Sequence, residues 1–155
     1  MVKFKINILL ILIITLFTSC NNTVFEDVKI IKNNAWIYND SISFDIKITN
    51  ENIPYNVFID IENSNKYKYS NLFLFVNIIS PNGKTITDTI DVFMADYKGK
   101  WVGAKKNDNY FGNYLFKQAV KFPKSGIYKT VIVHGMREDT LKGINKIGIT
   151  VKEIK

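Results

Sequence analysis

The sequence predicts an all-β protein, an antiparallel β-sandwich of immunoglobulin-like or jelly-roll-like type with about eight strands. Three observations predict this fold class. Apolar and polar residues alternate with a period of two over most of the chain after residue 23. Turn-forming residues separate the alternating segments, and no long stretch shows the 3.6-residue apolar periodicity of an amphipathic helix.

The alternation is clearest in the segment 42–48, where four large apolar residues take every second position. The segment 55–62 repeats this pattern less cleanly, while 72–79 is apolar on both parities, as is typical of a central strand. The predicted strands, in chain order, are 24–31, 42–48, 55–62, 72–79, 84–92, 114–122, 127–136 and 147–151.

Turn chemistry supports two of the boundaries between these strands. The sequence Ser-Pro-Asn-Gly-Lys at 80–84 predicts a hairpin, because Asn-Gly tolerates the positive φ of a tight turn. After Pro123, the sequence Gly126-Ile127-Tyr128 is similar to the tyrosine corner of immunoglobulin-like sandwiches, although a tyrosine that simply enters a strand after a turn explains it equally well.

One parity of the strands is expected to form the core between the two sheets. Truncation of such a side chain to Ala generally costs about 2–5 kcal/mol of stability. The predicted core residues are Phe44, Ile46, Val57, Ile59, Leu74, Val76, Ile147 and Ile149.

Composition excludes several functions. The 155 residues carry a formal net charge of +7 and contain one cysteine and one histidine. One cysteine excludes an intrachain disulfide and a multi-cysteine zinc site, so we expect no metal and no cofactor. Arg137 is the single arginine, and nucleic-acid readers depend on the planar arginine fork, so we expect no nucleic-acid partner.

The N-terminus has the pattern of a secretory signal peptide. Residues 1–20 read MVKFKINILLILIITLFTSC, in which two lysines precede an apolar run. This run is shorter than the ~20 apolar residues that comfortably span a bilayer. It ends in Leu16-Phe17-Thr18-Ser19-Cys20, which is similar to a lipobox, with Phe17 at the position where leucine is usual.

The residue types of this motif fit lipidation of Cys20. A thiol is required for the thioether to diacylglycerol, and the signal peptidase requires small side chains before the cut. The alternatives are a secreted protein with a free cysteine and an N-terminal anchor that is never cleaved. The predicted division is a signal peptide at 1–19, the lipidated cysteine with a short tether at 20–23, and a β-sandwich domain at 24–155.

Lipidation predicts a position at a membrane surface. Two acyl chains anchor a protein stably, at ~0.8 kcal/mol per buried methylene group. Asn21 follows the cysteine where the inner-membrane retention signal familiar from enteric bacteria has aspartate, which favours the outer membrane. Because the tether is so short, the domain is expected to sit close to the membrane.

The sequence favours a protein that is not an enzyme. A Ser-His-Asp triad would have to use His134, which lies in a predicted strand, and the chain contains no Gly-x-Ser-x-Gly motif. A strand histidine with a satisfied hydrogen bond is the expected alternative. Asp88, Asp91 and Asp96 are the nearest candidates for a carboxylate pair, and solvated strand and turn carboxylates explain them equally well.

The candidate binding region is the segment Ala95–Asn113, the longest stretch in which no strand is expected. Long loops on sandwiches often carry binding sites, and exposed tryptophan and tyrosine are typical interface anchors. Trp101 is expected either to be such an anchor or to fold back and cap the sandwich. The candidate partner-binding residues are Tyr97, Lys100, Trp101, Tyr110 and Phe111.

Several short motifs resemble a known family. They are Tyr69-Ser70-Asn71-Leu72, Pro81-Asn82-Gly83, Asp88-Thr89, Ala95-Asp96 with Gly99-Lys100-Trp101, Met136-Arg137 and Leu141-Lys142-Gly143-Ile144. In this order, within the segments 55–105 and 122–153, they are similar to the gliding motility lipoprotein GldH family of Bacteroidetes. The family also carries a lipobox, in agreement with Cys20.

The resemblance implies a cell-envelope lipoprotein of the gliding machinery that is linked to type IX secretion and contacts other envelope proteins of that apparatus. It implies no catalytic residues. The alternative function is a surface lipoprotein whose sandwich binds carbohydrate through loop aromatics. A flat exposed row of Tyr97, Trp101 and Tyr110 would favour carbohydrate, whereas a broader apolar patch would favour a protein partner.

Overall fold

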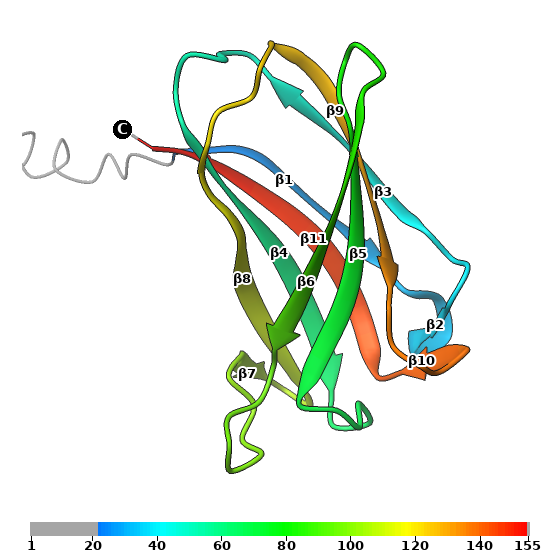
Figure 1. The fold of residues 1–155 in the computed structure, drawn as a ribbon. Coiled ribbons are helices and arrows are strands. Elements are labelled where there is room, and N and C mark those ends of the chain that lie inside the picture. The colour runs from blue at the N-terminus through cyan, green and yellow to red at the C-terminus, as the bar shows by residue number, and fades with distance from the viewer. Residues whose placement is uncertain (1–21, 155) are drawn as a thin grey trace, which may run out of the picture.

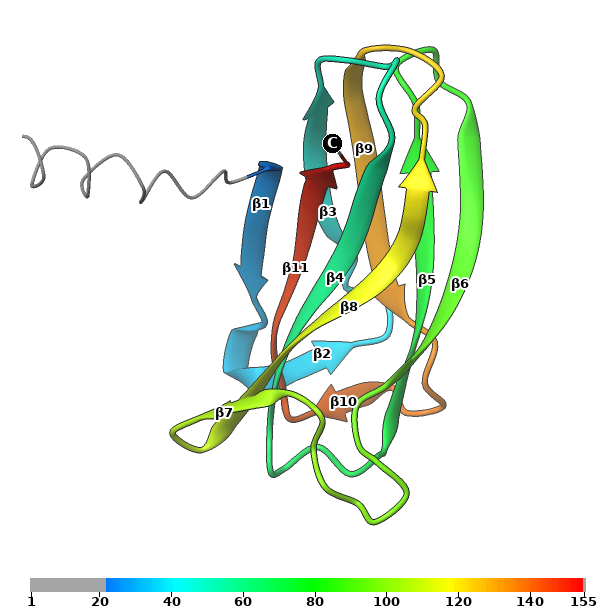
Figure 2. The ribbon, with the colours of Figure 1, turned by 90° about the vertical axis from the view of Figure 1, so that its left-hand side faces the viewer.

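The computed structural model describes residues 22–154, which form two antiparallel β-sheets packed face to face (Figures 1 and 2). The five-stranded sheet has the order β1-β11-β4-β8-β7, and the four-stranded sheet has the order β3-β9-β5-β6. A third, two-stranded sheet pairs β10 with β2. The antiparallel β-sandwich predicted from the sequence is confirmed.

The described strands differ widely in length. Eight have seven or more residues: β1 (Thr23–Ile30), β3 (Ile42–Ile48), β4 (Tyr55–Ser64), β5 (Asn71–Ile79), β6 (Thr85–Phe93), β8 (Asn109–Val120), β9 (Gly126–His134) and β11 (Ile144–Glu153). Three have three residues each: β2 (Ala35–Ile37), β7 (Ala104–Lys106) and β10 (Thr140–Lys142). A 3-10 turn, η2 (Lys32–Asn34), precedes β2.

The eight long strands coincide with the eight predicted segments to within a few residues at each end. The largest difference is β8, which starts at Asn109 rather than 114. The three short strands were not predicted, because three residues are too few to show a period-2 pattern. Pairing with a neighbour defines these strands, as in the register of Leu141 with Trp36.

The turn signals act as the sequence predicts. Ser80 and Lys84 close the β5–β6 hairpin through a 2.9 Å backbone hydrogen bond, and Gly83 adopts φ +81°. At the start of β9, the hydroxyl of Tyr128 donates a hydrogen bond to the carbonyl oxygen of Lys124 at 2.9 Å. A tyrosine hydroxyl bonded to the backbone a few residues upstream is the contact that defines a tyrosine corner.

The core lies between the two large sheets and is built from one parity of each long strand. All eight predicted core residues are buried, so this prediction is confirmed. Alternate residues of β4 and β11 meet alternate residues of β5 and β9, which is the geometry that removes most apolar area from water. The side chains of Phe25, Phe116 and Phe122 extend this core toward its edges.

One end of the core is closed by the β2–β10 pair. Trp36 is buried there and donates a hydrogen bond from Nε1 to the carbonyl oxygen of Asp40 at 2.7 Å. His134, with 0% of its surface exposed, lies with Nε2 3.1 Å from the carbonyl oxygen of Trp36. Because a carbonyl only accepts, Nε2 carries the proton of the neutral ring. The expected hydrogen-bonded strand histidine is therefore present, while its Nδ1 has no partner.

The described chain enters and leaves the sandwich at the same end. Asn22 and Glu153 exchange hydrogen bonds of 2.6 and 2.8 Å. The start of β1 and the end of β11 both lie toward the upper end in Figure 1. The segment between β6 and β7 lies at the opposite, lower end. Within residues 22–154, no helix has the length and apolar character needed to cross a membrane.

Burial of His134 predicts a pH-dependent stability. Desolvation lowers the pKa of this imidazole, while the hydrogen bond to Trp36 partly opposes the change. The unfolded chain therefore binds a proton near its ordinary pKa of about 6.5 while the folded chain does not, so stability is full above that pH and falls as the pH decreases. Urea titrations at pH 7.0 and 5.5 should show this loss.

The variant His134→Gln provides the control, because its amide can still donate to Trp36 without titrating. The carboxyl groups of Asp88 and Glu138 have lowered pKa values and titrate below this window. We expect the variant to have a flat free energy of unfolding between the two pH values, whatever its absolute stability. An unchanged pH slope in the variant would contradict the assignment.

Candidate functional site

The segment between β6 and β7 is held to the core at its base. Met94 is buried, and its carbonyl oxygen accepts a hydrogen bond from the backbone of Val102 at 2.9 Å. An isolated antiparallel bridge pairs Ala95 with Trp101. The chain from 94 to 102 is therefore a short hairpin, and we call residues 94–102 the tip hairpin.

Asp96 shapes the turn of the tip hairpin. One of its carboxylate oxygens accepts backbone hydrogen bonds from Lys98 at 2.8 Å and Lys100 at 2.9 Å. Gly99 adopts φ +77°, which a residue without Cβ accommodates without strain. These hydrogen bonds give the turn a defined shape. They account for Asp96 as a residue that stabilises the turn, and not as a member of a catalytic carboxylate pair.

The turn presents Tyr97 to solvent. This side chain is 92% exposed, and the ammonium of Lys98 lies 5.4 Å from its ring centroid. Lys100 is exposed beside it, and Val102 is exposed at the base. The tip hairpin therefore offers an aromatic ring and two cations on a defined turn at one end of the molecule.

Trp101 lies in a different environment from Tyr97. It is half-buried and packs against the core, with its ring centroid 6.3 Å from that of Tyr67 and 5.7 Å from that of Tyr110. Tyr67 is itself buried and continues the row to Tyr69 at 5.7 Å. Of the two expected roles for Trp101, the packing favours the cap of the sandwich.

The second half of the segment 95–113 is not irregular, in contrast to the expectation. Residues 104–106 form β7, which pairs with the first residues of β8. The chains approach so closely that a Cβ at Gly103 would lie 2.8 Å from the carbonyl oxygen of Phe111. The hairpin β7–β8 was missed because its residues are mostly polar and show no alternation.

The five predicted partner-binding residues therefore fall in three places. Tyr97 and Lys100 lie on the tip hairpin, and Trp101 and Tyr110 form part of the cap. Phe111 is exposed on the outer face of the five-stranded sheet, where it pairs with Glu62 of β4. The structure groups them as two pairs and one separate residue, not as one site.

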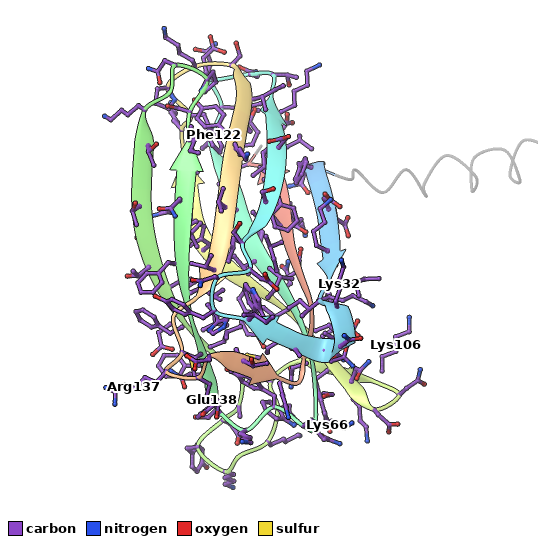
Figure 3. The ribbon with its side chains drawn as sticks, turned by 90° about the vertical axis from the view of Figure 1, so that its right-hand side faces the viewer. Lys32, Lys66, Lys106, Phe122, Arg137 and Glu138 are labelled. Carbon is purple, nitrogen blue, oxygen red and sulfur yellow. The ribbon has the colours of Figure 1, made fainter. Side chains whose placement is uncertain are left out.

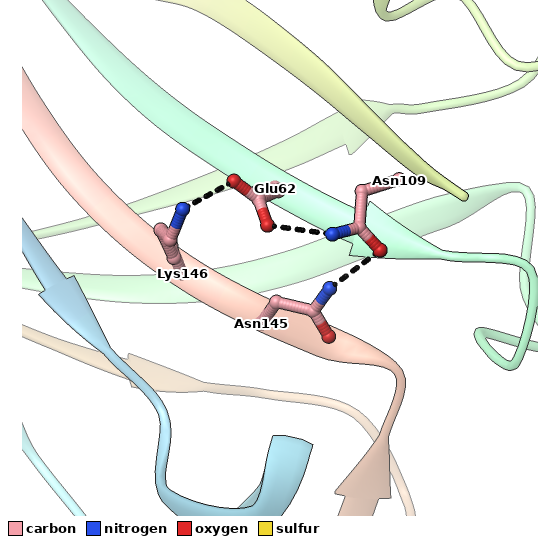
Figure 4. Close-up of polar contacts among 4 residues, drawn as sticks. All are labelled: Glu62, Asn109, Asn145 and Lys146. Carbon is pink, nitrogen blue, oxygen red and sulfur yellow. Dashed lines mark hydrogen bonds and ion pairs between the residues drawn. The ribbon is translucent and has the colours of Figure 1, made fainter. Parts of the chain in front are cut away.

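A polar network that the sequence did not indicate lies beside Phe111 (Figure 4). Glu62 accepts hydrogen bonds from Lys146 at 2.6 Å and from Asn109 at 3.0 Å, and Asn145 donates to Asn109 at 2.9 Å. The four residues come from β4, β8 and β11, and no short motif connects them. Only the strand register, in which Lys146 lies opposite Glu62, places them together.

A second carboxylate on this outer face is sealed from water. Asp60 is 3% exposed and accepts hydrogen bonds from Thr150, at 2.6 Å, and from Asn113. Gly148 lies opposite Asp60 in the register, and a Cβ there would lie 3.2 Å from that of Asp60. A hydrogen-bonded carboxylate without access to solvent stabilises its own sheet and is unsuited to acid–base catalysis.

The remaining candidates for catalysis are separated. Asp88 forms an ion pair with Lys117, whose hydrogen bond is the main cause of its lowered pKa. Asp91 accepts a hydrogen bond from Asn71 at 2.6 Å and lies on the opposite face of β6, because the two aspartates are three residues apart. In the part of the chain that is described, no three His, Cys, Asp or Glu residues are placed to hold a metal ion. Cys20 and the signal peptide lie outside the described residues.

Fold and surface together define a β-sandwich with an exposed turn, the tip hairpin, at one end, and no catalytic group is assembled among residues 22–154. The sequence pattern of the GldH lipoprotein family matches residues 23–151, so the chain belongs to this family. It is similar to the gliding motility lipoprotein GldH homolog of Christiangramia forsetii, with 33% identity over 90% of both chains. It is also similar to the gliding motility lipoprotein GldH of Flavobacterium johnsoniae, with 31% identity over 94% of both chains.

Substitution of two aromatic residues tests whether Trp101 has a structural role in the cap that Tyr97 on the tip hairpin does not have. We expect Trp101→Ala to lower the free energy of unfolding by about 3 kcal/mol, the low end for loss of a large core side chain, because Trp101 is only half-buried. Tyr97→Ala should change it by less than about 0.5 kcal/mol, because that ring makes few packing contacts. Urea denaturation of both variants and the parent domain measures the difference. Equal stabilities for the two variants would refute the cap.

Proposed function

We propose that this protein is a non-enzymatic, lipid-anchored component of the gliding motility apparatus in the cell envelope, linked to type IX secretion. It acts through protein–protein contacts made by the tip hairpin. Family membership supports the general role, since both relatives are named gliding motility lipoproteins. The outer membrane is the proposed location, because Asn21 replaces the aspartate of the retention signal.

The observation that carries the proposed contact is the placement of the tip hairpin. The described chain begins at Asn22, two residues after the proposed lipid on Cys20, at the end of the sandwich opposite to the tip hairpin (Figure 1). With this short tether, the anchor end lies close to the membrane. The tip hairpin then projects away from the bilayer, where a partner protein has access to it.

The chemistry of this end fits a partner with an acidic surface. Phe93, Tyr97 and Val102 are exposed large side chains at or next to the turn. Lys98 and Lys100 flank the tyrosine, and both are exposed. An exposed aromatic with an apolar neighbour is typical of an interface centre, and the lysines favour approach of a negatively charged protein.

Carbohydrate binding has less support from the geometry. The rings of Trp101 and Tyr110 are tilted by 39° and half-buried, so they do not extend Tyr97 into a flat exposed row. The burial of His134 supports a non-enzymatic role. Its ring packs against Trp36 and Tyr38, at centroid distances of 5.3 and 5.8 Å, and has no access to a substrate.

The anchor is tested at Cys20. Cys20→Ser removes the thiol that would carry diacylglycerol, so we expect neither acylation nor lipoprotein-type cleavage. Metabolic labelling with an alkyne fatty acid, followed by fractionation of the envelope, should show an unlabelled precursor or soluble protein. Fatty-acid label retained on the serine variant would refute the anchor.

The contact is tested by site-specific photo-crosslinking in the native envelope. We expect a photoreactive residue at Tyr97 to give one or a few discrete protein adducts. The same residue at Ile127 should not give them. This side chain is 58% exposed at the start of β9, and β9 begins at the end of the sandwich opposite to the tip hairpin (Figure 1). Tyr97→Ala with Val102→Ser should remove the adducts formed by a crosslinker at Lys100. Adducts at Ile127 but not at Tyr97 would place the working surface elsewhere.

A further inference from the structure

An apolar cleft of about 280 Å³ opens between the two sheets on the side where β6 faces β8. Its floor is formed by Val57, Ile59, Val76 and Ile149, which belong to the core and come from both sheets. Phe122 also lines the cleft and lies near the upper end of the molecule (Figure 3). The cleft therefore extends from solvent into the sandwich interior.

Two irregularities in β8 shape one wall of this cleft. The pairing of β4 with β8 shifts register between Tyr55 and Val57 and again between Val57 and Phe58. In a regular strand, neighbouring residues point to opposite faces, but Phe116 and Lys117 both line the cleft. Bulges re-aim side chains in this way and are frequent beside binding sites.

The bulge also contains backbone strain. Ala119 adopts φ +50°, a conformation uncommon for residues other than glycine. The side-chain oxygen of Asn56 accepts a hydrogen bond from the backbone N–H of Ala119 at 2.9 Å, which helps to hold this conformation. Strain that the surrounding contacts maintain is common at functional sites.

The mouth of the cleft is positively charged. Lys117 and Asp88 form an ion pair across it, which links β8 to β6. Lys121 lies on the rim, and a second hollow of about 240 Å³ continues from the cleft past Lys84 and Lys124. The two hollows thus contain one carboxylate, that of Asp88, and four lysines. Their combined volume lies within the ~300–1,000 Å³ that is typical of small-molecule sites.

The cleft lies at the anchor end of the sandwich. Across the five-stranded sheet, Asn22 bonds Glu153, Glu153 pairs with Tyr55, and Tyr55 pairs with Val120, which lines the cleft. Strands lie ~4.8 Å apart, so the entry point of the chain and the cleft are separated by about 14 Å along this row. Cys20 is two residues further, at most about 7 Å of chain.

We propose that this cleft binds a fatty acid, with the acyl chain between the sheets and the carboxylate at the lysines of the rim. An apolar interior next to a cationic rim is complementary to an amphiphile with one tail and one negative charge. The Lys117–Asp88 pair spans part of the mouth when the cleft is empty, and Lys117 turns to the ligand carboxylate when the cleft is filled. This inference does not depend on the partner proposed for the tip hairpin.

The first test is a titration of cis-parinaric acid into the domain 22–155, which contains every described strand of the sandwich; circular dichroism verifies folding. Ile86 is 54% exposed at the mouth, so Ile86→Trp should block entry without disturbing the core and should weaken binding at least tenfold. Thr89→Trp, on the outward face of the same strand, is the matched control and should bind as the parent does. Absence of saturable binding in the parent, or equal binding by both variants, would overturn the proposal.

The second test concerns the charged rim. Lys121→Gln with Lys124→Gln should weaken binding of parinaric acid severalfold and leave binding of the corresponding alcohol unchanged. Equal effects on acid and alcohol would refute the role of the lysines.

The third test uses the intact lipoprotein. Native mass spectrometry of protein extracted from envelopes should show one noncovalent fatty acid, which is lost in Ile86→Trp. If the domain binds the probe but the intact lipoprotein carries no added fatty acid, its own acyl chain fills the cleft, and the proposed ligand is wrong.

Discussion

The mutual burial of the two sheet faces is the interaction on which the other features depend. The inward rows of β4 and β11 pack against those of β5 and β9, and this contact removes the apolar parity of every long strand from water. Because successive side chains alternate, burial of one parity forces the other outward. The outer faces therefore carry polar side chains, and these side chains need hydrogen-bond partners at the surface of the sheet.

On the outer face of the five-stranded sheet, side-chain hydrogen bonds between neighbouring strands provide these partners. Asp60 is held by Thr150 and Asn113, and Glu62 by Lys146 and Asn109. Each carboxylate of β4 is bonded to a residue of β11 and a residue of β8. These contacts stabilise one register of the three central strands, since a slip of one residue would turn each carboxylate into the apolar core.

The two ends of the sandwich are closed in different ways, and this difference separates the two proposed sites. At the lower end, Trp36, His134 and the aromatic row through Tyr67 and Trp101 fill the space between the sheets, so binding can use only what projects beyond them. Near the upper end, the bulged β8 leaves an apolar cleft open beside β6. The proposed partner-binding turn and the proposed fatty-acid cleft therefore lie at different ends of the sandwich and share no residues.

The sequence alone determined the fold class, the eight long strands, the core parity, the hairpin at Gly83 and the family, because each depends on residues that are close in the chain. The lipid attachment at Cys20 is likewise a local prediction, and it stays one. Tertiary structure decided what depends on register and closure. It placed Trp101 in the cap, distributed Tyr97, Tyr110 and Phe111 over three surfaces, and assembled the network around Glu62 from three strands. The cleft also depends on tertiary structure. It forms where the side chains of the two sheets do not fill the space between them, and such incomplete packing leaves no pattern along the sequence.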